Sequence, residues 1–190
     1  MNENGQHILE LEELELGFLK RNLADFLTFS RVIISLVILS LSFVGQSAYM
    51  SVVILTLVGG ATDILDGNIA RRFLGENREG RLGKHDAEID TFFVLCVMAY
   101  FSFAGIAVQL AIGLGWIGLV VITYVLSRRS LKVLIVFEVI TVIALLVITF
   151  LYNFRIFWLV IAPTMAAGII INHRRLSYIL FDYWPRLFSG

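Results

Sequence analysis

Four aspartates form two pairs whose spacing suits metal-assisted chemistry on a phosphate. Asp63 and Asp66 are three positions apart, and Asp86 and Asp90 are four apart, so on helices each pair would project from one face. Four neighbouring carboxylates repel one another unless cations neutralise them, and oxygen-only ligands suit Mg²⁺ or Mn²⁺. We therefore predict a site that holds two divalent ions.

Small and basic residues follow the first pair. Gly67 directly follows Asp66 and has no side chain to obstruct a ligand, and Ala70 adds a small residue on the same face. Arg71, one turn further on, is placed to bind a phosphate. The other charged residues nearby (Glu76, Glu79 and Glu88) are interpreted as solvated helix ends, and His85 as a loop residue.

The elements that carry these aspartates are predicted to be membrane-spanning helices. The chain of 190 residues is 58% hydrophobic and 16% charged, with a mean hydropathy of +0.86, whereas about a quarter of the residues in a soluble domain are charged. A spanning helix needs about 20 mostly apolar residues. Six ranges are candidates: 26–44, 48–70, 89–106, 108–127, 131–152 and 155–172.

Basic residues lie almost entirely on one side of these six ranges. They precede the first range, lie between the second and third and between the fourth and fifth, and follow the sixth; the opposite connections hold only Arg155. Because Lys and Arg accumulate in cytoplasmic loops, both termini are expected in the cytoplasm. The two aspartate pairs then meet just inside the cytoplasmic boundary.

The predicted fold is all-α and integral to the membrane, in three parts. Residues 1–24 form an amphipathic interfacial segment, 25–176 a catalytic domain of six transmembrane helices, and 177–190 an aromatic interfacial tail. Pro163 is expected to kink the last helix, and the glycines of the 108–127 range allow close helix packing. A net charge of zero gives no reason to expect nucleic-acid binding.

The aspartate motif resembles the signature of the CDP-alcohol phosphotransferase (CDP-alcohol phosphatidyltransferase) family. That signature reads D-x2-D-G-x2-A-R, eight or nine residues, then G-x3-D-x3-D. Residues 63–71 match its first half, and Asp86 and Asp90 match its final pair. The sequence departs from it between the halves, where 14 residues separate Arg71 from Asp86 and Gly83 is one position closer to Asp86. A second element, N-x2-T-x2-R, is matched at Thr28 and Arg31, with Asp25 in place of the asparagine.

The resemblance implies the following roles. Asp63, Asp66, Asp86 and Asp90 would bind the metals, and Asp90 would also act as the general base. The nucleotide of the CDP-linked donor would contact Asp63, Asp66, Gly67, Ala70, Arg71 and Gly83. An acceptor hydroxyl would attack the donor's β-phosphorus and CMP would leave. The resemblance also implies a homodimer in a bacterial or archaeal cell (inner) membrane, working in phospholipid biosynthesis with CDP-diacylglycerol as the donor.

The acceptor is less defined. Thr28, Arg31, Arg128 and Arg129 are candidates for binding an acceptor such as a polyol or a polyol phosphate; for Arg128 and Arg129, a role in setting topology is an equal alternative. Glu138 lies inside a predicted span, where ionisable residues are costly. It is interpreted as contacting either the acceptor or a cation on another helix.

Two other functions stay open. Intramembrane prenyltransferases also bind a diphosphate through Asp–Mg²⁺ clusters, but this chain has one D-x3-D motif and six predicted spans. A transporter whose carboxylates relay ions would more often show internal repeats and acids at the midplane. A requirement for a cytidine nucleotide, or ion flux without substrate, would distinguish these alternatives.

Overall fold

The structure, a computed structural model, describes residues 26–73 and 85–171, without the side chains of residues 63–73, Asp86 and Ile171. Those described residues form helices joined by short turns, with no strand among them. The predicted segments 1–24 and 177–190 lie outside the described residues. The order is a first helix (Phe26–Leu41), η1 (Gly45–Ala48), α2 (Tyr49–Phe73), α3 (Asp86–Phe103), α4 (Leu110–Leu126), α5 (Leu131–Tyr152), α6 (Phe154–Ile156), η3 (Phe157–Ile161) and α7 (Ala162–Ile171).

Each of the six apolar ranges coincides with a helical segment. By length and composition α5 is suited to cross a membrane, with 22 residues and a mean hydropathy of 2.9, while Phe26–Leu41, Leu110–Leu126 and Phe154–Ile170 are shorter apolar helices. The count of six spans therefore stays a prediction. Large apolar side chains are exposed along these helices, among them Leu126, Leu159 and Ile170, and such a surface suits a lipid environment.

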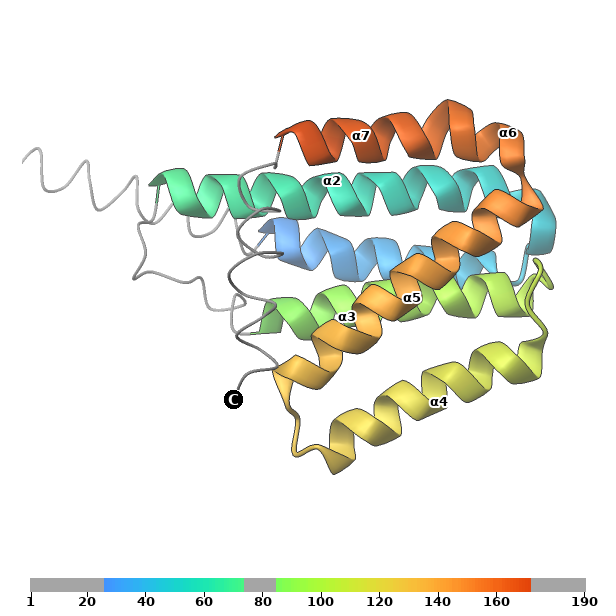
Figure 1. Ribbon diagram of the computed structural model, residues 1–190, viewed down its shortest axis with the longest axis horizontal. Helices are drawn as coiled ribbons and strands as arrows, with labels where there is room; N and C mark the ends of the chain where they lie inside the picture. Colours follow the sequence, from blue (N-terminus) through green and yellow to red (C-terminus); the bar gives the residue numbers. More distant parts are fainter. Residues whose placement is uncertain (1–25, 74–84, 172–190) are drawn as a thin grey trace, which may run out of the picture.

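The helices pack side by side as a bundle (Figure 1). The axes of the first helix, α2 and α3 lie roughly parallel, with the chain of α2 running opposite to the other two; α5 crosses them obliquely, and α4 lies at one edge. α3 packs against both α4 and α5. Gly113 makes the α3–α4 contact possible, because a Cβ there would lie 1.7 Å from the Ser102 hydroxyl. The indole of Trp116 donates to Thr141 Oγ1 at 2.9 Å and joins α4 to α5.

The final helical segment has an unexpected irregularity. A kink at Pro163 is predicted, and the structure places a π-helical turn, η3, directly before α7, with Pro163 as the second residue of α7. Proline has no N–H to donate to the carbonyl four residues earlier. Single π-turns inside helices occur frequently at functional sites.

A group of aromatic core residues lies at one end of the bundle. Tyr49, Tyr100 and Phe101 are buried and pack edge to face, and Tyr49 makes a similar contact with Tyr152. The Tyr100 hydroxyl donates to the Gly45 carbonyl at 2.9 Å, which ties α3 to η1. We call Tyr49, Tyr100, Phe101 and Tyr152 the aromatic cluster. It lies at the opposite end of α3 from the aspartates.

Candidate active site

Both aspartate pairs lie on helices, as the spacing predicts. Asp63 and Asp66 are in the last turns of α2, together with Gly67, Ala70 and Arg71, and Asp86 and Asp90 are in the first turns of α3. The side chains of residues 63–71 and of Asp86, and all of Gly83, lie outside the described residues, so the meeting of the two pairs stays a prediction. Among the described residues no group of three or more His, Cys, Asp or Glu side chains is placed to hold a metal.

Asp90 is held by an arginine of the first helix. Arg31 donates from one guanidinium nitrogen to Asp90 Oδ1, and from the other to Thr28 Oγ1 at 3.4 Å. The Arg31 side chain is 1% exposed and that of Asp90 is 24% exposed, while Thr28 is buried. Arg31 and Thr28, the two matched residues of the second motif, therefore lie beside the predicted general base.

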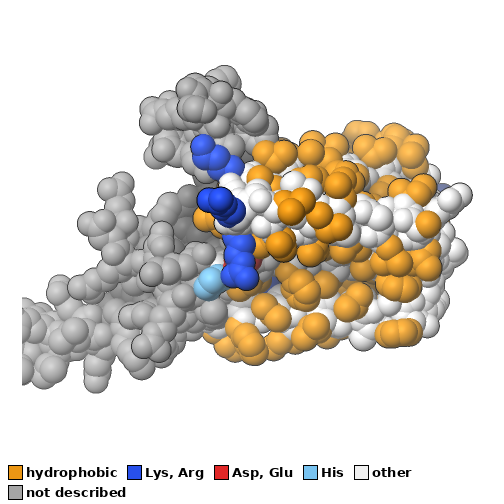
Figure 2. Space-filling model, turned by 90° about the horizontal axis from the view of Figure 1, so that it is seen from below, with side chains coloured by type: hydrophobic (Ala, Val, Ile, Leu, Met, Phe, Trp, Pro, Cys, Tyr) orange, Lys and Arg blue, Asp and Glu red, His pale blue; other side chains and the backbone are white. Residues whose placement is uncertain are grey.

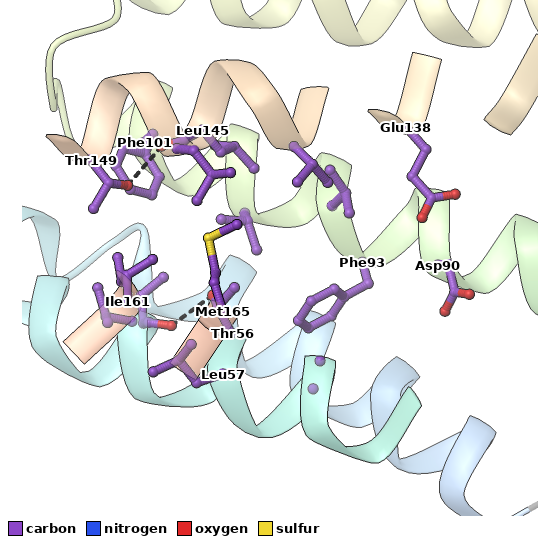
Figure 3. Close-up of a pocket in the computed structure, with 18 of the residues that line it drawn as sticks. Thr56, Leu57, Asp90, Phe93, Phe101, Glu138, Leu145, Thr149, Ile161 and Met165 are labelled. Carbon is purple, nitrogen blue, oxygen red and sulfur yellow. Dashed lines mark hydrogen bonds between the residues drawn. The ribbon is translucent and has the colours of Figure 1, made fainter. Parts of the chain in front are cut away.

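A cavity of about 330 Å³ begins at this ion pair. Its charged lining residues are Arg31, Asp90 and Glu138, and its other walls are almost entirely apolar. Figure 3 shows the carboxylates of Asp90 and Glu138 from facing helices at the same end of the cavity, with the apolar lining extending away from them. The volume lies at the lower end of the roughly 300–1,000 Å³ typical of small-molecule sites.

Gly59 and Gly60 of α2 both line this cavity but differ in their surroundings. A Cβ at Gly59 would lie 2.4 Å from the Phe93 ring, whereas one at Gly60 would meet nothing within 4 Å. Gly59 therefore allows α2 to approach α3 closely, as helix-packing glycines do.

Glu88 makes contacts that the sequence does not predict. It accepts a hydrogen bond from the Tyr124 hydroxyl of α4, and its other oxygen lies 2.6 Å from Nδ1 of His85, the residue that precedes α3. Glu88 precedes the predicted 89–106 span; the Tyr124 hydroxyl and then the His85 ring hold its pKa below the usual glutamate value. Glu88 is at a helix end and its side chain is 37% exposed, as expected, but it also joins α3 to α4.

The turn from α4 to α5 presents two arginines from a strained backbone. Arg128 and Arg129 have φ of 55° and 60°, a left-handed conformation that disfavours residues other than glycine. The Arg129 N–H donates to the Tyr124 carbonyl at 3.0 Å and the Arg128 N–H to the Val125 carbonyl at 3.2 Å. This is the Schellman pattern of helix ends, in which the residue directly after the C-cap, here Arg128, is usually glycine.

Most of the described basic side chains gather at one end of the molecule (Figure 2). Arg128, Arg129 and Lys132 are exposed around the α4–α5 turn, and the exposed Arg155 lies beyond the other end of α5. Apolar side chains cover much of the described surface in this view. The end with the basic side chains is also the end with Asp90 and His85.

Sequence reasoning identified most of these residues but not all of their partners. Tyr124 was missed, because an aromatic residue near the end of an apolar helix carries no distinct signal. Glu138 was identified as a costly intramembrane charge and is placed by the structure at the charged end of the cavity. The cavity itself was not predicted.

Comparison with known proteins agrees with the motif. A scan of protein-family models matches residues 21–171 to the CDP-alcohol phosphatidyltransferase family. Searches of curated proteins and of solved structures give no match. The matched range includes both aspartate pairs, Arg31 and the cavity. The chain therefore belongs to the CDP-alcohol phosphatidyltransferase family.

Proposed function

We propose that the protein transfers a phosphatidyl group from CDP-diacylglycerol to a hydroxyl of a polyol or polyol phosphate and releases CMP, as a step in phospholipid biosynthesis. Family membership supports phosphatidyl transfer from a CDP-alcohol. The observation that favours a lipid donor is the cavity, which is charged at the Asp90 end and apolar along the rest of its length. CDP-diacylglycerol is divided in the same way, because its charged diphosphate is joined to apolar acyl chains.

The four aspartates supply the donor set that Mg²⁺ or Mn²⁺ prefers, since all their ligand atoms are carboxylate oxygens. Asp63, Asp66, Asp86 and Asp90 would hold two such ions, which when bound neutralise charge on the diphosphate. The presence of both pairs in terminal helical turns supports this assignment.

The chain's own residues then carry the proton and orient the reactants. Asp90 takes the proton of the acceptor hydroxyl, the acceptor oxygen forms a bond to the β-phosphorus, and the bond from that phosphorus to the CMP oxygen breaks. CMP leaves with the bonding electrons. Arg31 holds the Asp90 carboxylate in place. A general base needs a fixed position, because proton transfer depends on hydrogen-bond geometry. Gly67, Ala70, Arg71 and Gly83 would contact the nucleotide.

Arg128 and Arg129 are our candidates for binding an acceptor phosphate, and Thr28 and Arg31 for the region around its hydroxyl. The left-handed backbone at Arg128 supports this role, because glycine would fit that position with less strain. A residue that adopts a backbone conformation unfavourable for its type suggests a function for its side chain. The end of α4 is also joined to α3 through Tyr124 and Glu88.

We further propose that both termini and the active site face the cytoplasm, in a bacterial or archaeal cell membrane. The exposed basic residues at the active-site end support this orientation through the positive-inside rule. We also propose a homodimer. Gly113 packs against α3 of the same chain. A Cβ at Gly115 or Gly118 would meet nothing within 4 Å, so these two glycines leave room for a helix of a second protomer.

The test uses purified protein in detergent with Mg²⁺ or Mn²⁺. CDP-diacylglycerol is supplied with glycerol 3-phosphate, inositol, inositol 1-phosphate, serine or choline, and CMP release is measured with and without EDTA. Asp90→Asn is the matched variant, because it keeps the size of the side chain and loses the basic charge. We expect release that requires one acceptor, stops with EDTA, and falls by about 10²–10⁴ in Asp90→Asn.

The outcomes separate the parts of the proposal. CMP release with an acceptor that carries no phosphate would refute the role of Arg128 and Arg129 in binding an acceptor phosphate. Metal-dependent binding of the donor without release with any acceptor would refute the choice of acceptors. Neither binding nor release from folded protein would refute the proposed function.

A further inference from the structure

The cavity follows one face of α3. Its lining residues there are Asp90, Phe93, Val94, Val97 and Phe101, a spacing that keeps side chains on one side of a helix. Asp90 and Phe101 are 11 positions apart, so this face extends for about 16 Å at the helical rise of 1.5 Å per residue. The cavity is therefore elongated along the bundle.

The facing helix repeats this arrangement. On α5 the lining residues are Glu138, Val142, Leu145, Leu146 and Thr149, again spaced to share a face. Glu138 and Thr149 are also 11 positions apart, which corresponds to about 16 Å. Both helices thus place a carboxylate at one end and a buried residue at the other.

The length of the cavity corresponds to one leaflet of a membrane. The hydrocarbon core of a bilayer is about 30 Å thick, so each leaflet contributes about 15 Å. A cavity of about 16 Å that begins at a charged end would reach from the lipid headgroup region to the middle of the bilayer. This is the depth that the acyl chains of a lipid in that leaflet occupy.

The end of the cavity away from the charges is formed by buried residues. Phe101, Thr149 and Ile161 are 3%, 5% and 8% exposed, and Figure 3 places them together at that end. Phe101 belongs to the aromatic cluster that fills the bundle beyond it. Ile161 belongs to the π-helical turn η3, so the chain departs from regular helix at the place where the cavity ends.

We propose that this cavity holds one acyl chain of the donor and that Phe101 and Ile161, at its end, select the length of that chain. This inference rests on the proposed function, because it specifies the lipid that the same site accepts. A chain that reaches Phe101 fills the cavity. A longer chain must bend or leave the cavity, and a shorter one leaves part of it empty, which forfeits packing contacts.

The test changes the length of the cavity from both directions. Val97→Phe adds bulk to a buried lining residue on the path to Phe101 and shortens the cavity, whereas Phe101→Leu extends it. Phe103→Leu is the matched control: it makes the same substitution on the same helix at a residue that is 52% exposed and does not line the cavity.

Each protein receives an equimolar mixture of a short-chain and a long-chain CDP-diacylglycerol with the acceptor that supports CMP release. The ratio of the two lipid products is measured by mass spectrometry. Because both donors compete for the same enzyme, the ratio does not depend on how much protein folds. A second measurement, the chain lengths of lipid that co-purifies with each protein, needs no turnover.

We expect Val97→Phe to lower the long-to-short ratio and Phe101→Leu to raise it, each by about threefold. This is less than the tenfold or more that a methylene gives in a pocket filled from water, because a lipid chain enters the cavity from hydrocarbon. Phe103→Leu should leave the ratio unchanged. Should Val97→Phe fail to fold, Phe101→Leu alone decides the result.

Two results have different meanings. A ratio equal to that of the wild type in the folded variants, together with unchanged co-purified lipid, would overturn the acyl-chain proposal while CMP release continues. Absence of CMP release from the wild-type protein with every acceptor would instead refute the proposed function. In that case the co-purified lipid still tests whether the cavity selects chain length.

Discussion

Replacing Arg31 with methionine should cost the protein both stability and rate. Methionine is apolar and flexible enough to occupy the space but cannot hold Asp90. Removing one member of a buried ion pair costs about 3–5 kcal/mol, because the other charge stays without its partner. The low end applies here, since Arg31 is 1% exposed but Asp90 is 24% exposed and keeps some contact with solvent.

A loss of about 3 kcal/mol corresponds to a decrease in melting temperature of about 6–12 °C for a chain of this length. The effect on rate should be larger. A displacement of about 1 Å in a catalytic group can reduce the rate about 100-fold, and Asp90, the proposed general base, would lose its hydrogen bond from Arg31. We expect kcat to fall by about that factor, with a smaller change in KM for the donor.

The assay combines thermal unfolding in detergent with CMP release. Arg155→Met is the matched control, because Arg155 is exposed at the other end of α5. Arg31→Lys should give an intermediate result, since a lysine keeps the charge but not the forked geometry that reaches both Asp90 and Thr28. In a double-mutant cycle with Asp90→Asn, the two changes should be non-additive by at least about 1 kcal/mol.

The reasoning is refuted if Arg31→Met unfolds within about 2 °C of the wild type and retains its kcat. Additive effects in the double-mutant cycle would show that the pair is not coupled. A decrease in stability of similar size in Arg155→Met would mean that the loss reflects general lipid or solvent contacts of arginine.

Three further contacts are tested by substitution. Gly113→Ala should destabilise the protein by about 1–3 kcal/mol because its Cβ overlaps α3. Gly60→Ala, where a Cβ would meet nothing within 4 Å, should be neutral or stabilising, so the unfolding temperatures of the two variants should differ. Arg128→Gly should raise stability by about 1 kcal/mol by relieving the left-handed strain, yet raise KM for a phosphate-bearing acceptor; unchanged KM would mean that the arginine serves only topology. Tyr124→Phe should lose about 1 kcal/mol of stability at neutral pH. Because the folded pKa of Glu88 is lowered, the difference from the wild type should shrink as the pH falls below the ordinary glutamate pKa of about 4.3. A difference that stays constant from neutral pH to well below that value would argue against the charged hydrogen bond.

Local patterns in the sequence were sufficient to place the aspartates on helix ends. Spacings of three and four residues have a direct meaning on a helix, and long apolar ranges define where the helices run. The pairing of Arg31 with Asp90 was beyond such reasoning, because the two residues are 59 positions apart and nothing local specifies which helices are neighbours. The contact of Glu88 with Tyr124 was missed for the same reason, since Tyr124 is on another helix.

The cavity could not be predicted from the same information. Val97 and Leu145 line an open space, while Ile38 and Val120 are fully buried and do not line it, yet all four are ordinary apolar residues in apolar helices. Whether such residues enclose a space or fill it depends on the angle and distance between helices. Pro163 predicted an irregularity in the last helix, but not that it would take the form of a π-turn beside the cavity.

The aromatic cluster has a consequence for how the bundle moves. At that end Tyr49 of α2, Tyr100 and Phe101 of α3, and Tyr152 of α5 are joined by ring contacts and by the bond to Gly45. Between that end and the Arg31–Asp90 ion pair, the cavity separates the same three helices. Amide exchange should therefore be slowest at the clustered end and faster beside the cavity, because local opening needs fewer contacts to break there. If the cavity takes up a lipid as proposed, we expect the helices to separate beside the cavity while the clustered end stays fixed.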